Sequence, residues 1–94
     1  MAIEINQKIV GDGIAKFGQD VQALKAVEEL AELSQILTKQ HIHPEKNYRN
    51  KIMEEVADVY VCLENVRKRY GLFDHEINLM IKAKQEKFKE NHLT

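Results

Sequence analysis

The chain has 94 residues, which suffices for one domain with a modest core and leaves no room for a second. Its 14 basic and 15 acidic residues give a formal net charge of -1, which argues against broad electrostatic capture of nucleic acid or of an anionic membrane. The single cysteine, Cys62, excludes an intramolecular disulfide, and no apolar stretch is long enough to span a membrane. We therefore expect one cytoplasmic domain over residues 1–94, whose function depends on local charge arrangement.

The first part of the chain predicts helices. No segment alternates apolar and polar residues over five or more positions, which argues against a sheet. Residues 4–17 predict a short helix, although Gly11 and Gly13 each cost about 1 kcal/mol relative to alanine in a helix interior. Its partial anchors are expected to be Ile5, Ile9 and Ile14. A longer helix is expected from Asp20 to about Gln40, because its apolar residues recur every three or four positions.

Two further helices complete the expected fold. Residues 41–47 read as a connection, with either Pro44 in a first helical turn or Asn47 as the amino-terminal cap of the third helix. That helix is expected to end near Tyr70, with Gly71 as a left-handed terminator. Asp74 is expected to cap a fourth helix that runs to about Asn91. The prediction is an all-α, antiparallel bundle of about four helices, completed by a homodimer or homotetramer because the apolar faces are too wide for 94 residues to cover.

Two acidic clusters lie within the second and third predicted helices. Residues three and four apart share a helix face, so Glu29 and Glu32 form one acidic surface and Glu55 and Asp58 form another. Carboxylates brought close together repel one another strongly, and a bound cation would relieve that repulsion. We therefore expect a cation site where the two helices meet. Histidine at the positions that di-iron bundles use is missing, which argues against iron.

The order of these clusters resembles the EExxE then ExxD signature of the MazG-like all-alpha nucleotide pyrophosphohydrolases. The matching segments are Val27 to Leu33 and Glu54 to Tyr60, and 22 residues lie between Glu32 and Glu55. Lys87 to Asn91 is similar to a lysine-to-asparagine element on the last helix of such proteins. The resemblance covers about residues 17–91. It departs from the family at the end, because no arginine follows Asn91.

The resemblance implies a site and an activity. It implies that Mg²⁺, or Mn²⁺, is bound by Glu29, Glu32, Glu55 and Asp58. Catalytic positioning of water is assigned to Glu28 or Glu32, and substrate binding to Gln22, Lys84, Lys87 and Asn91. The implied reaction is hydrolysis of a nucleoside or deoxynucleoside triphosphate to the monophosphate and pyrophosphate, in the service of nucleotide-pool house-cleaning.

Alternative interpretations remain open from the sequence. A phosphoribosyl-ATP pyrophosphatase shares the acidic site, and substrate comparison separates the two enzymes. A non-catalytic helical module would show neither magnesium-dependent stabilisation nor nucleotide binding. The acidic clusters would then be solvated helix faces, paired with lysines such as Lys25 and Lys51 at helical spacing.

Overall fold

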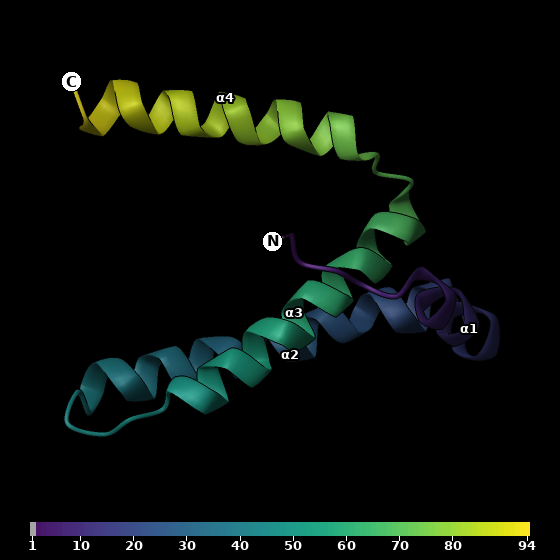
Figure 1. Cartoon of the computed structure of the whole chain (residues 1–94), viewed down its shortest axis with the longest axis horizontal. Helices are drawn as coiled ribbons and strands as arrows, with labels where there is room; N and C mark the ends of the chain where they lie inside the picture. Colours follow the sequence, from purple (N-terminus) through teal and green to yellow (C-terminus); the bar gives the residue numbers. More distant parts are fainter. Residues whose placement is uncertain (1) are drawn as a thin grey trace.

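The computed structural model describes residues 2–94, which form four α-helices and, within that range, no strand. The helices are α1 (Gln7–Phe17), α2 (Gln19–Ile42), α3 (Arg49–Tyr70) and α4 (Asp74–His92). In Figure 1, α2 and α3 run antiparallel as long neighbours, and α1 lies across one end of the pair. The prediction of an all-α fold is confirmed, with small shifts at the helix ends.

The first helix begins later than expected, at Gln7 instead of residue 4. Asn6 caps it, because the Asn6 Oδ1 accepts a hydrogen bond of 3.1 Å from the backbone N–H of Ile9. The prediction of Ile9 as an anchor was wrong, since Val10 is the buried side chain and Ile9 faces solvent. A Cβ at Gly13 would lie 2.7 Å from the Gln22 Nε2. This close approach explains a glycine in the helix interior.

The ends of α3 and α4 are set by local hydrogen bonds. Tyr48 is the amino-terminal cap of α3, so the prediction of Pro44 or Asn47 at its start was wrong. The Asn47 Oδ1 accepts a hydrogen bond of 3.0 Å from the N–H of Arg49 in the turn just before the helix. Gly71 ends α3 with a φ of +62°, as expected for a left-handed terminator. Asp74 is the first residue of α4 and not its cap, which corrects the prediction. The Glu76 side chain instead accepts a hydrogen bond of 3.3 Å from the N–H of Phe73.

Contacts at both ends fix the register of α2 and α3. At the connection, the Gln40 side chain donates to the carbonyl of Lys46 at 2.6 Å and accepts from the N–H of Tyr48 at 3.0 Å. At the opposite end, Asp20 pairs with Arg69. In an antiparallel pair aligned in this way, Glu32 of α2 lies opposite Glu55 of α3. The two ends of the hairpin thus determine which carboxylates meet in its middle.

A single copy of the chain is open. Its buried apolar side chains are few and mostly small: Val10, Ala23, Ala26, Ile36 and Cys62. The accessible surface is 7803 Å², against about 5,600 Å² for a folded monomer of this mass. The radius of gyration is 16.1 Å, against about 12 Å for a compact domain of this length. The helices of one chain therefore do not pack into the complete bundle that the sequence predicts.

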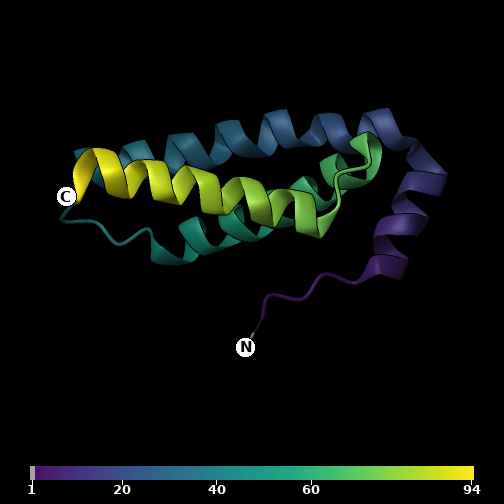
Figure 2. The same cartoon turned by 90° about the horizontal axis from the view of Figure 1, so that it is seen from above.

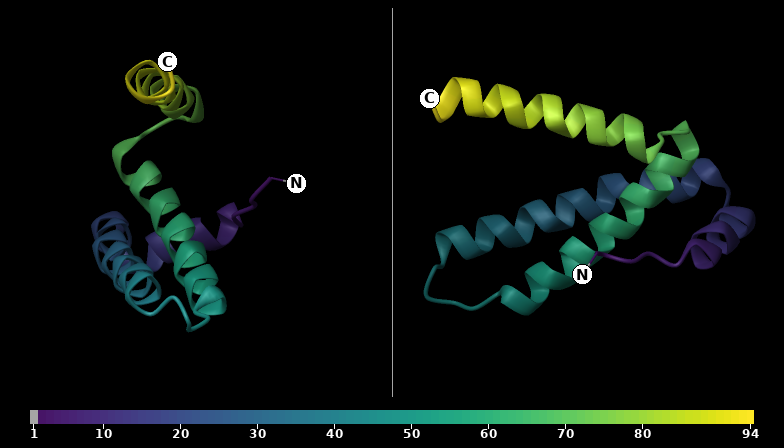
Figure 3. Two further views of the ribbon diagram at one scale, coloured as in Figure 1. Left: turned by 90° about the vertical axis from the view of Figure 1, so that its left-hand side faces the viewer. Right: turned by 45° about the horizontal axis from the view of Figure 1, so that its top comes forward.

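The helix that does not pack into the bundle is α4. Over residues 2–94, α4 packs against none of the other three helices. Viewed from above it overlaps α2 and α3 in projection (Figure 2), but the two further views show it well separated from them (Figure 3). Among the described residues, no helix combines the length and the apolar character needed to cross a membrane.

Candidate metal centre

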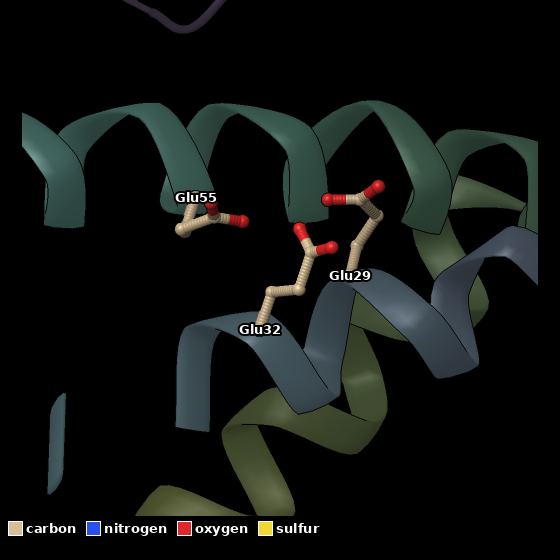
Figure 4. Close-up of side chains that lie close together, drawn as sticks. All are labelled: Glu29, Glu32 and Glu55. Atoms are coloured by element: carbon tan, nitrogen blue, oxygen red, sulfur yellow. The ribbon is translucent and has the colours of Figure 1, made fainter. Parts of the chain in front are cut away.

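Three carboxylates converge between α2 and α3. Glu29 and Glu32 project from successive turns of α2, and Glu55 projects toward them from α3 (Figure 4). One carboxylate oxygen from each residue lies within 4.8 Å of the other two. The helical spacing places Glu29 and Glu32 on one face, and the antiparallel register brings Glu55 to that face. Three of the four residues predicted as metal ligands are therefore gathered at one point.

The cluster is unusual because part of it is buried. Only 3% of the Glu55 surface is exposed, and Glu29 and Glu32 are partly buried. The Glu29 Oε2 and the Glu55 Oε2 are buried without a hydrogen-bond partner among the described residues. Ionised oxygens removed from water need a compensating charge or donor. A solvated acidic face would not have this property.

Lys51 supplies part of that compensation. Its Nζ lies 3.0 Å from the Glu55 Oε1, one turn away on α3, and 3.7 Å from the Glu54 Oε2. The hydrogen bond to Glu55, followed by the charges of Glu55, Glu54 and Glu32, raises the pKa of Lys51. The ammonium group therefore neutralises one side of Glu55 and leaves the other oxygen unpartnered. The sequence spacing had suggested Lys51 only as a surface partner.

The neighbouring negative charges help to raise the pKa values of two carboxyl groups on α2. Partial burial, followed by the charges of Glu32, Asp58, Glu55 and Glu28, raises the pKa of Glu29 above the ordinary value of 4.5. Partial burial and the close approach of the Glu55 carboxylate raise the pKa of Glu32 as well. Both groups hold protons more tightly than free carboxyls do. A divalent cation would relieve this repulsion and release those protons.

The remaining predicted acidic residues lie beside the cluster. Asp58 is exposed on α3, and its charge contributes to the raised pKa of Glu29, but it is outside the group of three. Glu28 is also exposed, and its charge acts on both Glu29 and Glu32. Both carboxylates are therefore near enough to influence the converging oxygens while remaining open to solvent.

A cleft of about 250 Å³ opens next to the carboxylates. It lies toward the carboxyl end of α2 and the beginning of α3, and it mixes acidic, amide and basic side chains. Its lining residues are Glu32, Gln35, Ile36, Lys39, Lys51 and Glu55. The adjacent lysines, which the sequence interpretation had not assigned to substrate, make this cleft suitable for an anionic group held beside a cation.

Gln22, which the resemblance assigned to substrate, is a buried residue of α2. It lies two helical turns before Glu29 on the same face, and 9% of its surface is exposed. Asn65 occupies the corresponding end of the α3 face and is 5% exposed. The Gln22 Oε1 and the Asn65 Oδ1 have no hydrogen-bond partner among residues 2–94. Two unpartnered buried amides therefore lie at the α1 end of the helix pair that carries the carboxylates.

The three residues predicted on the last helix are not part of this centre within one chain. Lys84, Lys87 and Asn91 are exposed on α4, which does not pack against α2 or α3 over the described residues. The structure thus brings together the predicted metal ligands from α2 and α3 but leaves the predicted phosphate-binding residues apart. The resemblance alone could not foresee this separation, because it gives no position for α4.

Comparison with known proteins adds no relative. No protein-family model matches the sequence, and neither a curated protein nor a solved structure matches it. The resemblance to the MazG-like family therefore stays a prediction based on the acidic motifs. The functional argument depends on the geometry of the centre.

Proposed function

We propose that the protein is a magnesium-dependent nucleoside triphosphate pyrophosphohydrolase with a MazG-like arrangement of helices. The observation that carries the proposal is the convergence of Glu29, Glu32 and Glu55, one oxygen from each lying within 4.8 Å of the others. The buried, unpartnered oxygens of Glu29 and Glu55 supply the reason for a bound cation. A helical interaction module would have no need for such a cluster.

The donor set fits magnesium. Mg²⁺ prefers hard oxygen ligands, keeps several waters and is usually held by a few carboxylates together with substrate phosphates. Glu29, Glu32 and Glu55 offer only oxygen, and Asp58, whose charge acts on Glu29, lies outside this group of three. Mn²⁺ has similar ligand preferences and is the expected substitute. The bound ion would polarise a phosphoryl oxygen and lower the pKa of a coordinated water.

The side chains around the cluster have separate roles in the proposed reaction. A water molecule attacks the α-phosphorus of the triphosphate, the bond between that phosphorus and the α–β bridging oxygen breaks, and pyrophosphate leaves. Glu28 or Glu32 accepts the proton of the water. Glu28 is suited to this role because it is exposed, while Glu32 is suited by its raised pKa. No protein nucleophile is required.

The cleft beside the cluster suggests where the phosphate chain lies. Lys39 and Lys51 line it together with Glu32 and Glu55, so an anion in the cleft would contact both the bound cation and ammonium groups. A cation bound to Glu55 would weaken the ion pair between Glu55 and Lys51, and the Lys51 ammonium would then be available to contact phosphate. Gln22 approaches the nucleotide from the other end of the α2 face.

The enzyme is proposed to act as a homo-oligomer in the cytoplasm. The exposed apolar surface favours a homodimer or homotetramer over a monomer. The single buried cysteine, Cys62, is compatible with the reducing cytoplasm. The expected biological role is the removal of unwanted (d)NTPs from the nucleotide pool.

An activity panel tests the proposal. The purified protein is incubated with common and deoxynucleoside triphosphates, and with phosphoribosyl-ATP, in the presence of Mg²⁺ or of EDTA, and the products are separated. We expect magnesium-dependent release of monophosphate and pyrophosphate from at least one nucleoside triphosphate. Release of orthophosphate, turnover of phosphoribosyl-ATP alone, or no turnover by the folded protein would refute the assignment.

A further inference from the structure

The cleft beside the carboxylates runs along the helix pair toward the α2–α3 connection. It is lined from α2 by Glu32, Gln35, Ile36 and Lys39, and from α3 by Lys51 and Glu55. Gln35 and Lys39 lie three and seven residues after Glu32 and therefore share its face of α2. Because side chains on a helix tilt toward its amino terminus, Lys39 reaches back over the turn that carries Gln35. The cleft thus begins at the cation ligands and ends at Lys39, about 10 Å further along the helix axis.

Lys39 is the lysine of the cleft that is free to bind an anion. Lys51 is already engaged, since its Nζ lies 3.0 Å from the Glu55 Oε1. Lys39 is exposed, and within residues 2–94 it forms no ion pair with a carboxylate. An unpaired ammonium at one end of a cleft and a cation site at the other suit an anion long enough to contact both.

The charge of the cleft depends on the cation. Without it, the two carboxylates of Glu32 and Glu55 cancel the two ammonium groups of Lys39 and Lys51. A divalent ion at the carboxylates leaves two positive charges in excess. Phosphate groups are therefore attracted into the cleft when the cation is bound and are not attracted when it is absent. Mg²⁺ commonly joins protein carboxylates to phosphate oxygens in this way.

The opposite direction along the helix pair offers different partners. Toward α1, the buried face carries the amides of Gln22 and Asn65, whose oxygens lack a hydrogen-bond partner within residues 2–94. Lys25, on this part of α2, holds its Nζ 5.3 Å from the centre of the Phe17 ring. Neutral amides donate and accept hydrogen bonds, which suits a nucleoside better than a chain of phosphates. The two directions from the carboxylates therefore differ in charge as the two ends of a nucleotide do.

We propose that the cleft binds the β- and γ-phosphates of the substrate, with the Lys39 ammonium and the Gln35 amide in contact with the terminal phosphate. This inference rests on the proposed hydrolase function and adds the orientation of the substrate to it. When water adds to the α-phosphorus, the α–β bridging oxygen keeps the electron pair of the broken bond and leaves as part of pyrophosphate, within the cleft. A diphosphate substrate places no phosphate at Lys39. Lys39 therefore selects nucleoside triphosphates over diphosphates, and it retains pyrophosphate as an inhibitor while the cation is bound.

Binding of inorganic pyrophosphate tests the cleft without requiring turnover. The whole protein is titrated by calorimetry with pyrophosphate and with orthophosphate, in Mg²⁺ and in EDTA. We expect pyrophosphate to bind in Mg²⁺, more tightly than orthophosphate, and to show no binding in EDTA. Lys39→Met should weaken pyrophosphate binding about tenfold, because one charge-assisted contact is lost. The matched control Lys46→Met removes an exposed lysine of the connection that does not line the cleft, and it should leave the affinity unchanged. Equal affinities of the wild type and Lys39→Met, or pyrophosphate binding in EDTA, would overturn the proposal.

Substrate selectivity separates this inference from the hydrolase function on which it rests. For a nucleoside triphosphate and the matching diphosphate, we expect the wild type to favour the triphosphate in kcat/KM and Lys39→Met to reduce that preference about tenfold. Triphosphate turnover with a preference that Lys39→Met leaves unchanged would refute the role of the cleft, while the hydrolase function stands. Conversely, pyrophosphate binding that requires both Mg²⁺ and Lys39, in a folded protein without turnover, would support the cleft as a diphosphate site and refute only the hydrolase function.

Discussion

Lowering the pH is a direct perturbation of the carboxylate cluster. The pKa values of Glu29 and Glu32 are raised above 4.5 in the folded protein, whereas unfolding returns them to that ordinary value. Between pH 4.5 and the raised values, the folded chain therefore binds up to two protons more than the unfolded chain. Consequently, the free energy of unfolding of the metal-free protein decreases as the pH rises through this window. Glu64 behaves oppositely, because its hydrogen bond with Arg67 lowers its pKa, so its stabilising effect is lost only as the pH falls below that window.

Cation binding reverses this dependence. Mg²⁺ binds the ionised carboxylates, and each proton displaced makes the apparent affinity about tenfold higher per pH unit, or about a hundredfold for two protons. Calorimetric titration of Mg²⁺ at several pH values above 4.5, in buffers of different ionisation enthalpy, measures the number of protons released. Glu32→Gln should reduce that number by one. A Mg²⁺ affinity that does not change with pH in this window, or a metal-free protein that gains stability as the pH rises, would refute the reasoning.

Three further predictions concern single residues. Glu55→Gln should lower turnover by several orders of magnitude while the melting temperature of the metal-free protein stays equal or rises; loss of folding in circular dichroism would mean that Glu55 is structural. Lys51→Met should strengthen Mg²⁺ binding, because the ammonium 3.0 Å from Glu55 no longer competes, and should weaken nucleotide binding; unchanged constants for both would contradict this role. Gly11→Ala should stabilise the fold by about 1 kcal/mol in urea denaturation. Gly13→Ala should gain less, since its Cβ would lie 2.7 Å from the Gln22 Nε2; equal gains would contradict the close approach.

The sequence predicted the helices and most of the acidic centre because both follow from helical periodicity. Glu29 and Glu32 share a face at three-residue spacing, and so do Glu55 and Asp58. The contact between the two helices could be predicted from the short connection alone, because helices joined by a short connection pack antiparallel. The burial of Glu55 follows from that packing. The sequence predicted that the carboxylates of the two helices meet, but it did not predict that Glu55 is buried.

Other features depend on contacts that no local pattern specifies. The connection is organised by three hydrogen bonds of the Gln40 side chain, which donates to the carbonyls of His43 and Lys46 and accepts from the N–H of Tyr48. Gln40 looks ordinary in the sequence. Val10 replaces Ile9 as the anchor of α1 because of the direction in which that helix crosses the pair. The amphipathic pattern of α4 indicates that one face is buried, but it does not distinguish its own chain from a second copy. Only the structure shows that α4 leaves its own chain uncovered.

The most direct test of the central claim is a crystal structure of the protein soaked in Mn²⁺, with data collected at a wavelength that gives anomalous scattering from manganese. We predict an anomalous peak between α2 and α3, bound by oxygens of Glu29, Glu32 and Glu55, with Lys51 displaced from Glu55. Carboxylates that point into solvent with no manganese between them, while the fold is intact, would contradict the account.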